Sequence, residues 1–435
     1  MTLREIALKL LLDYEQSGKY ANLSLSSHLA DGLSAQDRAG LTALFYTAVE
    51  RKITYDYLIS AISGRSIEKI SAHTRAILRL GLCQILHMDS IPDFAAVNET
   101  VKLAKNQGER SFVNGILRTA VRQKDSLPFP KREKNAARYY SVIYSLPIKT
   151  VRHFMSMLPE DECLTLFETF NSSLHTSLTV NTLKISVDEL LLSLEKSGYT
   201  ATRATFSPIT VCLPVSVDPK RLPGFSEGHI FVQDEASALA AIALGAAAGD
   251  TVIDVCSAPG GKSLVSAILS GDGARIYSFD IHESKLSLIN ATRERLGITG
   301  ISASVRDALS PDESLVDCAD RVICDVPCSG LGVIAKKPDL RYKDIEEGDL
   351  PALQLSILKS SVRYLRRGGT LVYSTCTLND AENRDVVAKF LSEEQDIYLE
   401  PFTAGTLSAP DGMITLWPHI HGTDGFFIAK LRKKQ

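Results

Sequence analysis

The chain has 435 residues, of which 45% are hydrophobic and 23% are charged, and its formal net charge is −3. These values exclude a disordered or strongly basic protein and predict two or three globular domains. No apolar run is long enough to span a membrane, and no signal-peptide pattern opens the chain. The eight cysteines form no CxxC pair. Because that spacing suits neither zinc nor disulfides, we expect free thiols in a reducing cytoplasm and no metal.

Helical periodicity dominates residues 1–130, so we expect an all-α domain there. Apolar residues recur at helical spacing in Leu3–Leu11, and Ser34 is placed to cap the next helix. Further helices are expected at about 93–105 and around Phe112–Leu117.

Charge is distributed unevenly in this part of the chain. Residues 102–138 hold ten Lys/Arg against three acids, a local balance of +7 (ten minus three). Such a run is either a solvated helix face or a phosphate-binding surface, and charge alone leaves both open.

The middle of the chain contains a predicted linker, a helical stretch and a small β-α-β unit. Residues 125–135 contain two prolines, lack periodicity and predict a linker. After a helical stretch at about 140–172, Ser177–Lys184 and Ile209–Leu213 are strand candidates on either side of a helix at Val187–Lys196. An open sheet face of this small β-α-β unit can carry single-stranded RNA, although few aromatic residues are available for stacking.

From about Phe231 onward, strands and helices alternate. Strands are expected at 251–255, 275–280, 301–305, 321–325, 370–375 and 425–431, with helices at about 261–270, 283–296, 351–366 and 379–394. This rhythm predicts a parallel sheet with helices on both faces.

A glycine-rich turn follows the first of these strands, at Asp254–Ser263. Gly261-Lys262-Ser263 matches the end of a phosphate-binding P-loop, which also requires glycine at position 256. That position is Cys256, and Pro259 has no N–H to donate to a phosphate. The alternatives left are an ordinary turn and a cradle for another nucleotide-like ligand.

Acidic residues and cysteines follow the expected strands. Aspartates 254, 280, 307 and 325 stand at successive strand ends, and Asp280 is placed to accept ribose hydroxyls. Cys328 and Cys376 reach the same edge from neighbouring strands. Two thiols beside a nucleotide-like ligand suit substitution at carbon 5 of a pyrimidine, because a thiolate that adds to carbon 6 activates carbon 5. Asp325 is placed to stabilise charge at the ring's N3.

These motifs resemble those of the RNA cytosine-C5 methyltransferases. The matching segments are Pro259-Gly-Gly-Lys262, Asp325-Val-Pro-Cys328-Ser-Gly, Ser374-Thr-Cys376-Thr, Phe231-Val-Gln-Asp-Glu-Ala-Ser237 and Asp424-Gly-Phe-Phe-Ile-Ala-Lys430. Ile91–Val101 and Phe112–Arg118 resemble a NusB-like RNA-binding domain. Together they are similar to the NusB-fused 16S rRNA cytosine-C5 methyltransferases (Sun/Fmu type).

The resemblance implies three parts. They are an all-α NusB-like domain (1–130), linker helices with a small α+β RNA-recognition subdomain (131–230), and an α/β Rossmann-like class I methyltransferase domain (231–435) that uses S-adenosylmethionine. It further implies a monomer that acts on small-subunit rRNA. A tRNA cytosine methyltransferase and a catalytically inert RNA-binding factor are the alternatives.

The resemblance also implies individual roles. Cys376 is the expected nucleophile, Cys328 assists product release, and Asp325 lies between donor and base. Cofactor contacts are expected from Cys256, Ser257, Ala258, Pro259, Gly260, Gly261, Lys262, Asp280, Asp307 and Asp325. Two positions depart from the family pattern: Thr179 replaces an arginine before Asn181, and Ser257 replaces an alanine.

Overall fold

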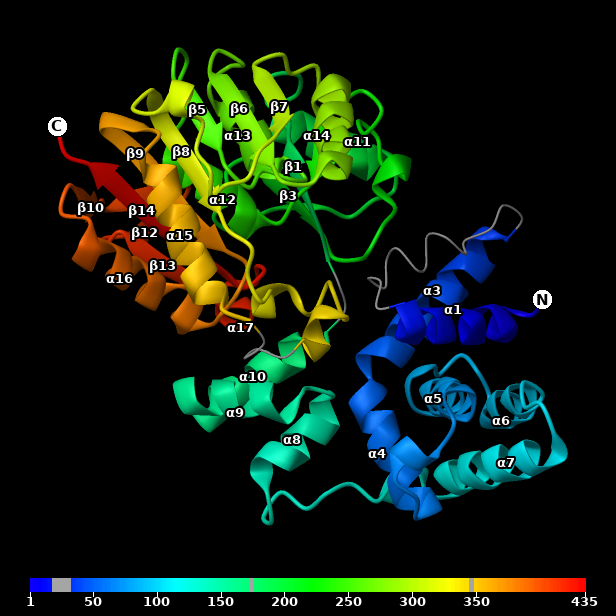
Figure 1. Ribbon diagram of the computed structural model, residues 1–435. Coiled ribbons are helices and arrows are strands. Elements are labelled where there is room, and N and C mark those ends of the chain that lie inside the picture. The colour runs from blue at the N-terminus through cyan, green and yellow to red at the C-terminus, as the bar shows by residue number, and fades with distance from the viewer. Residues whose placement is uncertain (18–32, 173–174, 344–347) are drawn as a thin grey trace. The chain divides into compact units, whose positions relative to one another are not determined.

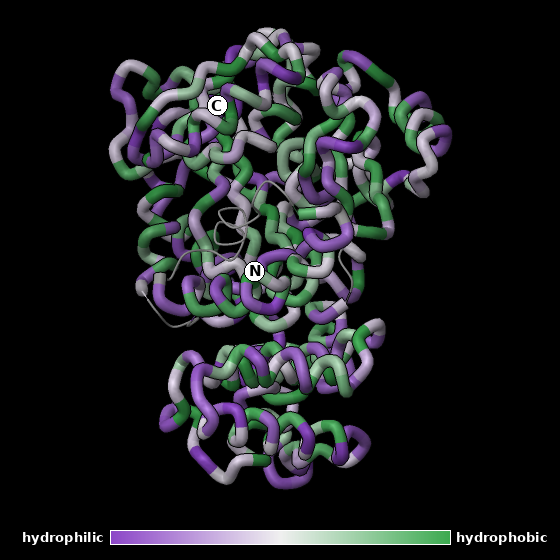
Figure 2. Tube along the Cα trace, turned by 90° about the vertical axis from the view of Figure 1, so that its right-hand side faces the viewer, coloured by the Kyte–Doolittle hydropathy of each residue, from purple (hydrophilic) through white to green (hydrophobic). Residues whose placement is uncertain are grey.

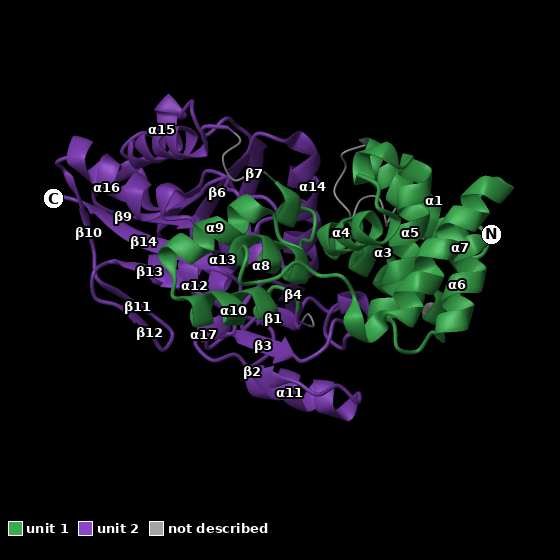
Figure 3. Ribbon diagram, turned by 90° about the horizontal axis from the view of Figure 1, so that it is seen from below, with its two compact units in different colours: residues 1–171, 336–345 green, residues 172–335, 346–435 purple. Residues whose placement is uncertain are grey.

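The computed structural model describes residues 1–17, 33–172, 175–343 and 348–435. The chain forms two compact units, residues 1–171 with 336–345 and residues 172–335 with 346–435 (Figure 3). The region 131–230 is divided between them, with its helices in the first unit and its strands in the second. None of the described helices is both long and apolar enough to cross a membrane.

The described elements of the first unit are all helices or 3-10 turns, which confirms the all-α prediction. Its helices are α1 (Leu3–Ser17), α3 (Ala35–Glu50), α4 (Lys52–Ser63), α5 (Ala72–His87), α6 (Asp93–Val101), α7 (Gln107–Arg122), α8 (Ala136–Tyr144), α9 (Ile148–Met157) and α10 (Glu160–Thr169). Ser34 caps α3 as expected, because its side chain accepts the amide of Asp37. Asn106 caps α7 in the same way. Hydrophilic and hydrophobic residues are interspersed along the described parts of the trace (Figure 2).

Helix α5 lies at the centre of the N-terminal helices. It packs against α1, α3, α4, α6 and α7, and most of its residues are buried. A Cβ at Gly81 of α5 would stand 2.6 Å from the methyl carbons of Leu117 on α7, so the glycine permits this close approach. Short 3-10 turns (Ile67–Lys69, Lys124–Ser126 and Leu340–Tyr342) complete the first unit.

The second unit contains an eight-stranded sheet with the order β10-β14-β9-β8-β5-β6-β7 and with β13 paired to β14 (Figure 1). The strands are β5 (Thr251–Asp254), β6 (Arg275–Asp280), β7 (Ile301–Val305), β8 (Ala319–Asp325), β9 (Leu365–Thr375), β10 (Ile397–Leu399), β13 (Met413–Leu416) and β14 (Phe426–Lys433). Strands β5 to β9 are parallel, as predicted. The parallel prediction is wrong for β14, which runs antiparallel to β9. It follows β13 as an antiparallel partner, without the crossover helix that a parallel strand requires.

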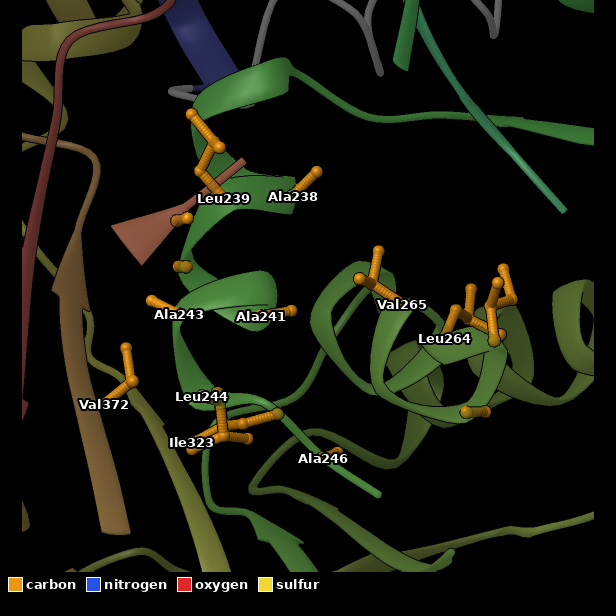
Figure 4. Close-up of a cluster of buried hydrophobic side chains, with 14 of the residues drawn as sticks. Ala238, Leu239, Ala241, Ala243, Leu244, Ala246, Leu264, Val265, Ile323 and Val372 are labelled. Atoms are coloured by element: carbon orange, nitrogen blue, oxygen red, sulfur yellow. The ribbon is translucent and has the colours of Figure 1, made fainter. Parts of the chain in front are cut away.

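Helices cover both faces of this sheet because side chains alternate along each strand. Val252 of β5 and Ile323 of β8 belong to the apolar cluster with α12 (Glu235–Leu244), α13 (Gly261–Leu269) and α14 (Glu283–Leu296). Figure 4 shows Ile323 and Val372 near α12. Ile253 and Val322 face the opposite cluster, with α15 (Leu350–Val362) and α16 (Arg384–Glu393). The predicted helix over 379–394 is wrong at its start: a 3-10 turn occupies Asp380–Glu382, and α16 begins at Arg384.

A four-stranded antiparallel sheet precedes the large one, in the order β2-β3-β1-β4. Its elements are β1 (Thr176–Val180), α11 (Val187–Lys196), β2 (Thr202–Arg203), β3 (Thr210–Leu213) and β4 (Ile230–Val232). All five residues of β1 are buried. Because α11 covers one side of β1 and α12 lies against the other, the expectation of an open face is wrong at this strand.

Smaller elements complete the second unit. They are the hairpin β11 (Phe402–Ala404) and β12 (Leu407–Ala409), the short helix α17 (Pro418–His421), and the 3-10 turns Pro219–Arg221, Glu313–Leu315 and Leu331–Val333.

Candidate active site

The candidate site lies at the carboxyl edge of the large sheet. After β5 the chain builds β6 and β7 on one side and then crosses to β8 and β9 on the other. Loops therefore diverge between β5 and β8, and such a reversal of strand order is where open α/β sheets bind ligands.

The loop after β5 is folded against β6. The Ser257 amide donates to the Phe279 carbonyl at 2.8 Å, and the Gly260 amide donates to the Ser257 carbonyl at 2.6 Å. Gly260 has a φ of +104°, a region that favours glycine, and it leads directly into α13. The Ala258 amide donates to Asp280 Oδ2 at 3.3 Å. The tight turn thus brings the glycine-rich residues and Asp280 together, as predicted.

Two aspartates at the ends of β6 and β7 differ in environment. Asp280 is 7% exposed, and its Oδ1 accepts the amide of His282 at 2.9 Å. Asp307 is exposed and accepts the amide of Leu309 within its own turn. The Arg306 amide donates to the Asp280 carbonyl at 3.1 Å, which brings the chain just before Asp307 to the end of β6.

Asp254 lies underneath the loop, away from the surface. It is fully buried and accepts the hydroxyl of Ser263 at 2.7 Å. Burial raises the pKa of Asp254 to about 7, because removing a carboxylate from water disfavours its charge. Burial also raises the pKa of the neighbouring Cys256 thiol. Asp254 therefore belongs to the interior beneath the loop, whereas Cys256 remains partly exposed.

Lys262 and Asp325 form an ion pair at the centre of the site. Lys262 is 7% exposed, and its Nζ lies 2.7 Å from Asp325 Oδ2. It also donates to Ser237 Oγ at 3.0 Å. The second oxygen of Asp325 accepts the hydroxyl of Ser374 at 2.6 Å. Two fixed partners therefore orient Asp325, whose side chain remains 31% exposed. Spacing along the sequence did not indicate this pair, since 63 positions separate its members.

The two predicted cysteines meet at the ends of β8 and β9. The Sγ atoms of Cys328 and Cys376 are 3.2 Å apart, and both thiols are partly exposed. Asp325 pairs with Ser374 in the register of these strands, which places both loops at one edge. The pKa of Cys328 is raised well above its usual value, first by its hydrogen bond to Cys376 and then by burial.

Glycine contacts hold the cysteine loops close to the last strand. The Gly332 amide donates to the Cys376 carbonyl at 3.0 Å, and the Gly425 amide donates to the Gly332 carbonyl at 2.8 Å. A Cβ at Gly332 would stand only 1.9 Å from the Gly425 carbonyl oxygen, so a side chain there cannot be accommodated. The segment Asp424–Lys430, which resembles the family's last strand, thus contributes the glycine that lets the cysteine loop approach this strand.

Sequence reasoning missed the residues behind these loops. Glu382 and Asn383 are buried and bond to residues adjacent to Cys328 and Cys376. The available signal was the polar run Asn379–Asn383, which interrupts the apolar periodicity expected of a helix start.

The departure at Thr179 lies inside the second unit. Thr179 is buried, and its hydroxyl donates to Gln233 Oε1 at 3.1 Å. Asn181 is buried as well and donates to the carbonyls of Gly228 and Leu296, both at 3.0 Å. Both side chains therefore tie the small sheet to its surroundings.

In the first unit, the basic run of 102–138 places exposed arginines along α7. Arg110, Arg118 and Arg122 are all exposed, and Arg118 and Arg122, four residues apart, lie on the same side of the helix. Within the described ranges, Arg118 bonds to Asn114 and Arg122 to Thr119, while neither has an acidic partner. In contrast, Lys102 is paired with Glu99.

The residues described contain no cluster of three or more His, Cys, Asp or Glu side chains arranged to hold a metal ion. The helical unit, the Rossmann-like sheet and the loop after β5 together define a methyltransferase fold joined to a NusB-type domain. The NusB family model matches residues 1–122, and the model described as 16S rRNA methyltransferase RsmB/F matches residues 241–432.

The chain belongs to the RsmB/F family of RNA methyltransferases. It is 34% identical over 459 residues to the probable ribosomal RNA small subunit methyltransferase B of Bacillus subtilis, covering 100% of this chain and 99% of that protein. Identity to the corresponding protein of Synechocystis sp. is 36% over 447 residues, covering 99% of each. The crystal structure of PH0851 is similar with a TM-score of 0.82 and 27% identity, covering 100% of this chain and 99% of the other.

Proposed function

We propose that this protein transfers a methyl group from S-adenosylmethionine to carbon 5 of a cytosine in RNA, with small-subunit rRNA as the substrate. The observation that carries the proposal is the 3.2 Å separation of the Cys328 and Cys376 sulfur atoms beside Asp325. Carbon 5 of cytosine is a weak nucleophile, and covalent addition at carbon 6 is the chemistry that activates it.

The residues around the loop after β5 fit the proposed cofactor. The buried carboxylate of Asp280 accepts two backbone amides and retains acceptor positions for ribose hydroxyls. The buried Ser257 hydroxyl has no hydrogen-bond partner among the described residues and is available to a ligand. S-adenosylmethionine supplies a methyl group on a positively charged sulfur, and the partly exposed carboxylate of Asp325 suits that charge.

The cysteines and Asp325 then divide the reaction between them. The Cys376 thiolate forms a bond to carbon 6, and the electron pair of the carbon 5–carbon 6 double bond moves to carbon 5. When Asp325 carries a proton, it donates a hydrogen bond to N3 and so stabilises the negative charge that develops there. Carbon 5 then gains the methyl group as the methyl–sulfur bond of the donor breaks, which leaves S-adenosylhomocysteine. Cys328, after losing its own proton to solvent, accepts the proton of carbon 5. The double bond re-forms, and Cys376 departs as a thiolate.

The hydrogen bond between the sulfurs supports this division. Either sulfur can donate this hydrogen bond. The raised pKa of Cys328 favours the arrangement in which its proton points to Cys376, and an accepting Cys376 is favoured as a thiolate. The target base must be unpaired or flipped to reach this sulfur. The exposed arginines of α7 would bind phosphates without reading sequence.

Two cysteine variants test the proposal. Cys376→Ala is expected to abolish methyl transfer while donor binding persists, and Cys328→Ala is expected to accumulate RNA bound covalently to protein. The measurements are transfer of labelled methyl groups and RNA retention on a denaturing gel. Cys318→Ala, which removes an exposed thiol, is the control. Full activity of Cys376→Ala, or no retained RNA with Cys328→Ala, would contradict the proposed roles.

The identity of the RNA needs a separate measurement. Bisulfite mapping of rRNA and tRNA from cells lacking the protein is expected to show one lost 5-methylcytosine in small-subunit rRNA. If a 5-methylcytosine is lost from tRNA instead, tRNA replaces rRNA as the proposed substrate. An unchanged map together with no turnover of the donor would indicate an inert RNA-binding factor.

A further inference from the structure

Glu382 is a buried carboxylate behind the cysteine that assists release. It ends the 3-10 turn Asp380–Glu382 and is 1% exposed. Its oxygens accept the Ser329 amide at 2.9 Å and the Ser329 hydroxyl at 2.5 Å. They also accept the side-chain amides of Gln354 at 2.9 Å and Asn379 at 3.1 Å. Four donors suit an ionised carboxylate, which only accepts hydrogen bonds.

The contacts of Glu382 hold the chain on both sides of Cys328. Ser329 is bound directly by Glu382. Gln354, itself bound to Glu382, donates from the same Nε2 to the Pro327 carbonyl at 2.9 Å. The backbone before and after Cys328 is thus attached to one buried carboxylate.

The next residue does the same for the other cysteine. Asn383 is fully buried, and its Oδ1 accepts the Thr375 hydroxyl at 2.6 Å. Its Nδ2 donates to the Thr377 carbonyl at 3.0 Å. Thr375 and Thr377 flank Cys376 directly. Two consecutive residues therefore each hold one cysteine loop.

The two loops are also joined to each other. The hydroxyls of Ser329 and Thr377 lie 2.7 Å apart. Tyr373 on β9 donates its hydroxyl to the Glu382 carbonyl at 2.6 Å, which fixes the backbone of the turn to the strand that carries Cys376. Because the side chains of Ser329, Thr377, Tyr373 and Glu382 are all buried, water cannot replace a lost partner.

We propose that Glu382 and Asn383 are positioning residues that hold the two cysteines separately, Glu382 for release through Cys328 and Asn383 for addition through Cys376. This inference rests on the proposed function. Neither residue touches the reacting atoms, so each acts through the loop that it holds. Loosening one loop is expected to slow one step of the reaction and to leave the other step intact.

The test compares Glu382→Gln with Asn383→Ala. The glutamine keeps the size of the side chain but turns one acceptor into a donor that faces the donors of Ser329 and Gln354. We expect Glu382→Gln to retain single-turnover methyl transfer and to lose steady-state turnover by roughly tenfold, the scale of a hydrogen bond to a charged group. Covalently retained RNA should rise, as in Cys328→Ala. Asn383→Ala should instead slow single-turnover transfer and retain no RNA.

A matched control separates positioning from folding. Glu235 is also a buried carboxylate of the second unit, 4% exposed, and it accepts the amides of Phe206 and Ser207 at 2.5 and 2.6 Å. Glu235→Gln should lower thermal stability without changing the fraction of retained RNA. Glu382→Asp, which keeps the charge, should recover part of the turnover.

The outcomes are distinguishable. If Glu382→Gln and Asn383→Ala lose both steps in parallel, as expected of general unfolding, the inference is overturned. Should Glu382→Gln fail to fold, the retained-RNA fraction of Glu382→Asp decides: a rise supports positioning, and the wild-type value overturns it. If Cys328→Ala retains no RNA, the proposed function has failed, whatever the Glu382 variants show.

Discussion

The segment 336–345 of the first unit and the turn at 380–383 of the second each bring a charged side chain into the interior. Arg341 and Glu382 are both 1% exposed. Arg341 donates to the carbonyls of Tyr144 at 3.2 Å and Phe170 at 2.7 Å, at the ends of α8 and α10. Its partners are thus largely orphan carbonyls of helix ends, where a cation is favourable. Glu382 instead binds groups beside the cysteines. The same degree of burial joins helix ends in one region and fixes the two cysteine loops in the other.

The largest effect is expected from substituting Arg341, the buried charge of the first unit. Arg341→Met should destabilise the first unit by about 3–5 kcal/mol, because the Phe170 carbonyl and the Asn171 side-chain oxygen lose the charged donor that Arg341 provides. Chemical unfolding followed by circular dichroism and limited proteolysis measures the loss. Lys343→Met, an exposed position two residues later, is the control. A loss no greater than that of the control would show that the helix ends do not depend on Arg341.

The ion pair in the second unit should matter more for chemistry than for folding. Asp325→Asn removes the charge that faces Lys262 and is expected to lower single-turnover methyl transfer by about 100- to 1000-fold, as for other groups that stabilise developing charge. The Lys262→Met, Asp325→Asn double variant should regain stability over the single variant, because no buried lysine is left alone. Equal rates for Asp325→Asn and the wild type would remove Asp325 from the reaction.

Asp254 is a second buried carboxylate of the second unit, but it has fewer hydrogen-bond donors than Glu382. Its Oδ1 has no hydrogen-bond partner among the described residues, unlike the oxygens of Glu382. The pKa of Asp254 is raised from 3.8 to about 7, so the folded protein keeps a proton that the unfolded chain loses. Stability is therefore lost as pH rises from about 4 to about 7, by at most about 1.4 kcal/mol per pH unit from this group.

Asp254→Asn should flatten this pH dependence. Denaturant midpoints of the wild type and the variant at pH 5, 6 and 7 measure the difference in slope. The control is Asp307→Asn, since Asp307 is exposed on the same sheet edge. If stability changes with pH equally in the wild type and in Asp254→Asn, the proton that causes this dependence is bound by another group.

The smallest effect is expected on the surface of the first unit. Reversing Arg118 and Arg122 to glutamate should weaken RNA binding by roughly tenfold and reduce the salt dependence of affinity, because fewer counterions are released. Fluorescence anisotropy at several salt concentrations measures both. Lys102→Glu, at a position already neutralised by Glu99, should change binding less. Unchanged affinity would indicate that the basic residues form an ordinary solvated helix face that does not bind RNA.

Several elements were predictable because their signals are local. Helix α14 begins and ends at residues 283 and 296, as expected, and β6 and β7 have their predicted bounds. Strands β10 to β13 were missed because each has only three or four residues. The start of α16 was misplaced because the side chain of Asn379 bonds to Glu382 within the turn, and that of Asn383 bonds to Thr375 at the end of β9.

By itself, the sequence determined that the first part is all-α, which aspartates and cysteines follow which strand, and the family. These properties depend on periodicity and short motifs, which involve only neighbouring residues. The tertiary structure alone decided which distant groups meet. It paired Lys262 with Asp325, inserted Arg341 among the helix ends, and placed Glu382 behind Cys328. These contacts follow from the packing of elements far apart in the chain, where burial makes each polar partner obligatory.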